Sequence, residues 1–63
     1  MRLSASPQAV VQMVSAYAPA AEQPAACAVA LFINSGNDLD LNHPTTASGL
    51  KTLERLDLII KES

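Results

Sequence analysis

Apolar side chains recur at helical spacing in the first part of the chain. They lie three and four residues apart, at Val10, Met13, Val14 and Tyr17. Before them, Ser6 can cap an open backbone amide, and Pro7 suits the first position of a helix. Pro19 cannot continue a helix, so it ends this one or lies just beyond it. The pattern predicts an amphipathic helix that begins at Ser6–Pro7 and ends by Pro19.

The next segment, residues 24–33, is apolar at every position. A helix without a polar face is normally buried on all sides. A strand is the rival interpretation, because alternate positions would place Cys27, Val29, Leu31 and Ile33 on one face and Ala28, Ala30 and Phe32 on the other. The many alanines and the length of the segment favour the helix. The sequence Asn34-Ser35-Gly36 follows, and a glycine in this place commonly ends a helix.

A third apolar stripe follows Pro44, after a connector over residues 37–44 in which Leu39 and Leu41 can contact the core. The stripe is made of Leu50, Leu53, Leu56 and Ile60, with Ile59 at its edge. The candidate N-caps are Thr45, Thr46 and Ser48. The spacing predicts a helix to about Lys61, with Asp57 and Lys61 as an ion pair four residues apart. Leu58 falls outside the stripe.

These segments predict an all-α fold of three short helices with an apolar central helix, in a single domain over residues 1–63. A chain this short buries only about 60% of its unfolded surface. Its core then supplies about 3–5 kcal/mol. Cys27 is the single cysteine, so an internal disulfide and a multi-cysteine zinc site are both excluded. We therefore expect the core to be completed by dimerisation.

The charge is distributed unevenly between the two halves of the chain. Residues 1–37 carry only Arg2 and Glu22, so most of the surface of the first half has no charge. Such a surface favours contact with another polypeptide. The predicted partner-binding residues are Val10, Met13, Val14, Tyr17, Leu31 and Phe32. The alternative interpretation makes the same residues the core of a monomer.

Composition also bears on location and on broad classes of partner. No apolar run approaches the ~20 residues that a membrane-spanning helix needs, so we expect no membrane association. The single thiol indicates a reducing compartment, and we expect the protein in the cytoplasm. The net charge of −2 argues against broad attraction to phosphate backbones.

The connector holds a set of residues that suggests a metal site. The spacing Asp38-x-Asp40-x-Asn42 matches the opening of a calcium-binding loop. His43 then stands where that loop requires glycine, and Gly49 stands where it requires a bidentate glutamate. We therefore interpret the segment as a solvated turn whose side chains bond their own backbone, with no metal bound.

Patterns typical of catalysis are missing. Cys27 lies among alanine and valine, where a thiol acts as a small apolar side chain, so a Cys27–His43 pair is rejected as a nucleophile and its base. The sequence Gly49-Leu50-Lys51-Thr52 lacks the spacing of a phosphate-binding loop. Three short helices also leave little room for an active-site pocket. We expect no enzymatic activity and no cofactor.

One stretch has more specific character. From Thr46 to Ile59 the chain contains Leu50-x-x-Leu53-Glu54, followed by the apolar pair Leu58-Ile59. This stretch resembles the recognition helix and following turn of winged-helix regulators, with Asp57 where a turn glycine is common. The resemblance implies nucleic-acid contacts from Thr46, Ser48, Lys51 and Arg55, with Thr45 also facing the major groove.

We expect a small, non-enzymatic intracellular protein that binds another protein, by docking or by blocking, as a homodimer. Compact acidic chains of this size are often accessory or regulatory products of bacteria or their phages. The alternative function is a helix-turn-helix-like or winged-helix-like DNA-binding regulator that uses a helix over residues 46–61.

Overall fold

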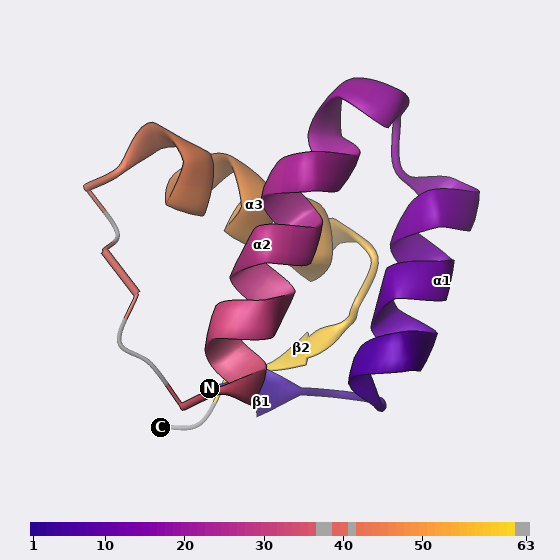
Figure 1. Cartoon of the computed structure of the whole chain (residues 1–63), viewed down its shortest axis with the longest axis horizontal. Coiled ribbons are helices and arrows are strands. Elements are labelled where there is room, and N and C mark those ends of the chain that lie inside the picture. The colour runs from indigo at the N-terminus through magenta and orange to yellow at the C-terminus, as the bar shows by residue number, and fades with distance from the viewer. Residues whose placement is uncertain (37–38, 41, 62–63) are drawn as a thin grey trace.

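A computed structural model describes residues 1–36, 39–40 and 42–61. The elements in chain order are β1 (Arg2–Leu3), α1 (Pro7–Tyr17), a short 3-10 helix η1 (Ala20–Glu22), α2 (Gln23–Asn34), α3 (Pro44–Arg55) and β2 (Ile59–Ile60). Figure 1 shows α2 between α1 and α3, and α2 contacts both of them. The three predicted helices are confirmed. The two short strands are an addition that the helical pattern did not predict.

The start of α1 follows from local chemistry. The Ser6 hydroxyl oxygen accepts a hydrogen bond from the Ala9 amide at 3.2 Å, and Pro7 occupies the first helical position. The helix ends at Tyr17, two residues before Pro19. Both ends of this helix agree with the prediction from the sequence.

The apolar segment after Pro24 is a helix, so the strand interpretation is wrong. α2 ends where Gly36 adopts a left-handed backbone at φ 74°, and the Gly36 amide donates to the Ile33 carbonyl at 3.1 Å. Only part of α2 is buried, at Ala26, Val29 and Ala30. Its opposite side, at Ala28, Leu31 and Phe32, is exposed. The expectation of a helix buried on all sides is therefore also wrong, because neighbours cover only one side of α2.

The third helix differs from the prediction at both ends. α3 begins at Pro44, and its N-cap is His43, whose Nδ1 accepts a hydrogen bond from the Thr45 amide at 3.2 Å. None of the three predicted caps has this role. α3 ends at Arg55, six residues before the predicted end at Lys61.

A tight turn ends α3. The Asp57 amide donates to the Glu54 carbonyl, and the Leu58 amide donates to the Leu53 carbonyl, both at 3.0 Å. This pair of bonds, with Asp57 at φ 60°, is a Schellman motif. The motif turns Leu58 back onto the core, where it is buried. The predicted ion pair with Asp57 does not form, because the helix has ended; Lys61 Nζ instead lies 3.2 Å from Glu54 Oε2.

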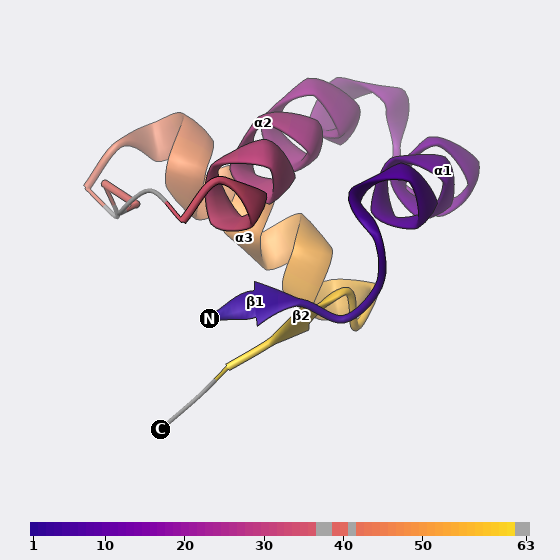
Figure 2. The same cartoon turned by 60° about the horizontal axis from the view of Figure 1, so that its bottom comes forward.

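The chain leaving this turn pairs with the start of the molecule. β2 lies antiparallel to β1, with Leu3 opposite Ile59 and Arg2 opposite Ile60 (Figure 2). The Ser4 amide extends the contact by donating to the Leu58 carbonyl at 2.9 Å. Leu3 and Ile59 pack on the core. The sheet thus ties the region after α3 to the region before α1.

The core lies where α2 meets the other helices. Its buried apolar residues are Val10, Val14, Ala18, Ala26, Val29, Ala30, Leu53, Leu58 and Ile59. Gly49 lets α3 approach α2 closely. A Cβ atom at Gly49 would lie 2.7 Å from Val29 Cγ2 and would also contact the carbonyl group of Ala25. The contact between α2 and α3 therefore requires a residue without a side chain at position 49.

Replacing Asp57 with glycine is expected to stabilise the protein. Asp57 is the one non-glycine residue with a positive φ in the described part of the chain. A residue with a Cβ atom in this conformation costs about 1 kcal/mol relative to glycine. The gain should raise the thermal midpoint by about 4–8 °C. Asp57→Ala serves as the control and should give no gain, because alanine keeps the Cβ atom. An equal rise in both variants would contradict this explanation.

Candidate interaction surface

The six predicted partner-binding residues do not form one surface. Val10 and Val14 are each 0% exposed, so they belong to the core and are removed from the candidate site. For these two residues the monomer-core interpretation is correct, because they face α2 and lie in the same buried cluster. The other four side chains are all exposed.

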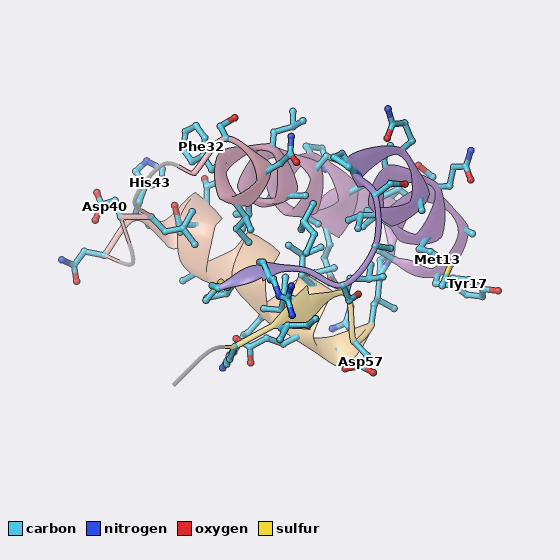
Figure 3. The ribbon with its side chains drawn as sticks, turned by 90° about the horizontal axis from the view of Figure 1, so that it is seen from below. Met13, Tyr17, Phe32, Asp40, His43 and Asp57 are labelled. Carbon is cyan, nitrogen blue, oxygen red and sulfur yellow. The ribbon has the colours of Figure 1, made fainter. Side chains whose placement is uncertain are left out.

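The exposed residues fall into two separate groups. Met13 and Tyr17, 40% and 67% exposed, form the α1 patch. Leu31 and Phe32, 54% and 49% exposed, form the α2 patch. Figure 3 shows Met13 and Tyr17 together at one end of the molecule, and Phe32 near His43 and Asp40 at the opposite end. One flat contact cannot cover both patches at once.

A groove lies beside Phe32. Its volume is about 310 Å³, and it is formed between α2 and the beginning of α3. The side chains that line it are mostly apolar on the α2 side, at Ala28, Val29 and Phe32, and polar on the other side, at Asp40, His43, Thr45 and Thr46. Sequence reasoning missed this groove, because its lining comes from α2, from the connector and from the start of α3.

The polar rim of the groove is shaped by local hydrogen bonds. Asp40 Oδ1 accepts from the Asn42 amide at 3.1 Å, as expected for a turn whose side chains bond their own backbone. Asp38 lies outside the described residues. Within the residues that are described, no three acidic, histidine or cysteine side chains come together in a way that could hold a metal ion.

Cys27 is half-buried and packs against the core. The Nδ1 atom of His43 is engaged at the start of α3. The structure thus gives each of these two residues a packing or capping role of its own.

The two helices of the first half have no charged side chains on their surface. α1 and α2 carry no charged side chain.

Glu22, just before α2, turns inward. Its Oε1 atom accepts hydrogen bonds from Thr52 Oγ1 at 2.7 Å and from Arg55 Nη2 at 2.6 Å. This contact joins η1 to α3. The Thr52 hydroxyl, and then the Arg55 guanidinium, lower the pKa of the Glu22 carboxyl below its ordinary value.

Acid is expected to weaken the protein partly through Glu22. Because its pKa is lower in the folded state, the stability that the carboxylate contributes is present above its ordinary pKa of 4.5. It is lost as the pH falls through the folded-state value. Thermal midpoints measured from about pH 7 to about pH 3 should therefore fall less steeply below pH 4.5 in Glu22→Gln than in the wild type. Two curves of equal slope would contradict this role.

The residues predicted to contact nucleic acid have mixed environments. Thr46 is only 7% exposed, so it is removed from the candidate set. Ser48 and Lys51 are exposed on the outer side of α3. Arg55 is also exposed, but its guanidinium is held by Glu22. The outer side of α3 therefore presents Ser48 and Lys51 most freely.

Each helix in the described part of the chain is too short or too polar to cross a bilayer. Comparison of the chain with known protein families, with curated proteins and with solved structures finds no match.

Proposed function

We propose that this protein acts by binding another polypeptide, without chemistry on the bound partner, inside the cell. The observation that carries the proposal is the exposure of Met13, Tyr17, Leu31 and Phe32 on a domain of 63 residues. Apolar side chains gathered on a surface mark interaction sites in soluble proteins. The absence of charged side chains from α1 and α2 adds support, because charged residues are depleted at the centres of interfaces.

The two aromatic residues are the strongest anchors. Full burial of an apolar side chain of this size contributes about 1.5–3 kcal/mol. Aromatic residues also dominate the binding energy of measured interfaces. Tyr17 and Phe32 are the two aromatic residues of the chain, and both remain about half exposed or more.

Site-specific photo-cross-linking tests the proposal. A benzoylphenylalanine placed at position 17 or at position 32 should give discrete cross-linked products with a polypeptide. The same group at Gln12, an exposed polar position on α1, should give few or none. Equal labelling from all three positions, or no product from positions 17 and 32, would refute the proposal.

A second candidate function is DNA binding through α3. It is favoured by the outward position of Ser48 and Lys51, and by the turn and strand that follow α3 where the resemblance to winged-helix regulators lies. Fluorescence anisotropy with duplex DNA should then show an affinity that falls steeply with salt. Lys51→Ala should weaken binding, and Lys61→Ala serves as the control. Absence of binding at about 50 mM salt would exclude this function.

A further inference from the structure

We propose that the groove beside Phe32 accepts the Tyr17 side chain of a second copy of this chain, so that copies associate head to tail. This inference rests on the proposed function and names the partner and the contact. Both halves of the contact are present on one molecule, at opposite ends (Figure 3).

The groove is large enough to admit an aromatic side chain. Its volume of about 310 Å³ is at the lower limit of the roughly 300–1,000 Å³ typical of small-molecule sites. Ala28 and Val29 supply apolar surface on the α2 side, and the half-exposed ring of Phe32 borders it. A second aromatic ring can pack against Phe32 in an offset or edge-to-face arrangement.

The polar rim of the groove matches a phenol group. His43 Nδ1 accepts the Thr45 amide proton, so in the neutral imidazole the proton is on Nε2, which is a donor. Asp40 presents a carboxylate, which accepts hydrogen bonds. A tyrosine hydroxyl both donates and accepts. The rim therefore offers tyrosine one partner of each kind, and phenylalanine, leucine or methionine could bond to neither.

Tyr17 is placed to enter such a groove. Among the large apolar side chains of the described residues it is the most exposed, at 67%, and it stands at the last position of α1. Small residues follow it, at Ala18, Pro19, Ala20 and Ala21. α1 carries no charged side chain, so it brings no carboxylate against Asp40 at the rim. Charge and shape therefore both permit the approach.

The positions of the two patches determine the type of assembly. A contact between unlike surfaces is heterologous, and it either closes into a ring or continues as a chain of copies. A two-fold dimer would need the Tyr17 of each copy to occupy the groove of the other at the same time, and it would stop at two copies. Because the two patches lie at opposite ends of the molecule, the open arrangement is favoured. The apparent mass of the wild type should therefore rise beyond that of a dimer as concentration increases.

Mixing two variants tests the contact. Tyr17→Ala removes the inserted side chain and keeps the groove. Ala28→Glu keeps Tyr17 and places a charge in the groove, at an exposed helical position that tolerates substitution. Each variant alone should be monomeric by sedimentation velocity, and an equimolar mixture should form dimers that do not grow. Phe32→Ser is a second groove variant, for use if Ala28→Glu does not fold.

Two further variants refine the test. Tyr17→Phe keeps the ring and loses the hydroxyl, so it should weaken association by about fivefold. Gln12→Ala, on the exposed side of α1, should leave association unchanged.

The outcomes separate this inference from the proposed function. A mixture that remains monomeric, a wild type that stops at two copies, or undiminished association of Tyr17→Ala would each overturn the head-to-tail contact. A monomeric wild type that still cross-links from position 17 to a different protein would overturn this inference and leave the proposed function intact. Absence of any cross-link from positions 17 and 32 would overturn both.

Discussion

Replacing Gly49 with alanine is expected to remove most of the stability of the domain. The new Cβ atom would lie 2.7 Å from Val29 Cγ2 and would press against the backbone carbonyl of Ala25. A backbone group cannot rotate away as a side chain can, so α2 and α3 must separate. Overpacking of this kind costs about 1–3 kcal/mol and occasionally more, and here we expect the upper end. The total stability available to a domain of this size is about 3–5 kcal/mol.

Gly36→Ala is the matched control for this prediction. Gly36 also resists substitution, but only because its φ is 74°; apart from its chain neighbours, no atom of the described residues lies within 4 Å of a Cβ atom placed there. Its cost should be about 1 kcal/mol. Urea unfolding of both variants, followed by circular dichroism, gives the comparison. A smaller loss for Gly49→Ala than for Gly36→Ala would show that the close contact between α2 and α3 is absent in solution. Alanine at position 49 also gains up to about 1 kcal/mol of helix propensity, so any net loss understates the clash.

Replacing Leu53 with alanine is expected to have an effect of similar size through the opposite change, the creation of a cavity. Leu53 is 0% exposed and is among the largest fully buried side chains. It lies on α3 one turn before the chain folds back at Leu58, and both residues belong to the same core cluster. Leu-to-Ala changes in cores cost about 2–5 kcal/mol. That range overlaps the whole stability expected of this domain.

Leu31→Ala makes the same chemical change on the surface. Leu31 is 54% exposed, so its truncation should change the free energy of unfolding by no more than about 0.5 kcal/mol. Thermal melts of the two variants at low protein concentration, where association does not contribute, measure the difference. Equal losses in the two variants would mean that Leu53 is not the core residue that the fold makes it.

The helices could be predicted because their signals are local. Ser6 caps an amide three residues away, and Gly36 ends a helix through a bond to Ile33. The prediction of α3 was wrong after Arg55 because the apolar stripe continues at helical spacing to Ile60 while the backbone does not. Asp57 takes a left-handed conformation there, and Ile59 pairs with Leu3, which is far away in the sequence.

The candidate site was likewise predictable where the signal is local and unpredictable where it depends on tertiary contacts. Val10, Met13, Val14 and Tyr17 belong to one stripe, but only the two valines are covered by the rest of the protein. Helical spacing identifies the stripe and cannot say how much of it a neighbouring helix will cover. His43 was considered only as a metal ligand or a base, and its place before Pro44, at the start of a helix, was the available signal for its capping role.

The sequence by itself determined three helical segments, the capping of the first, the glycine stop of the second, and a first half with almost no charge. These are properties of neighbouring residues. The tertiary structure decided where α3 ends, that β1 and β2 pair, which apolar residues remain exposed, and that Gly49 lies against Ala25. Those features depend on contacts between residues distant in the chain, whose free energy is set by how whole elements pack.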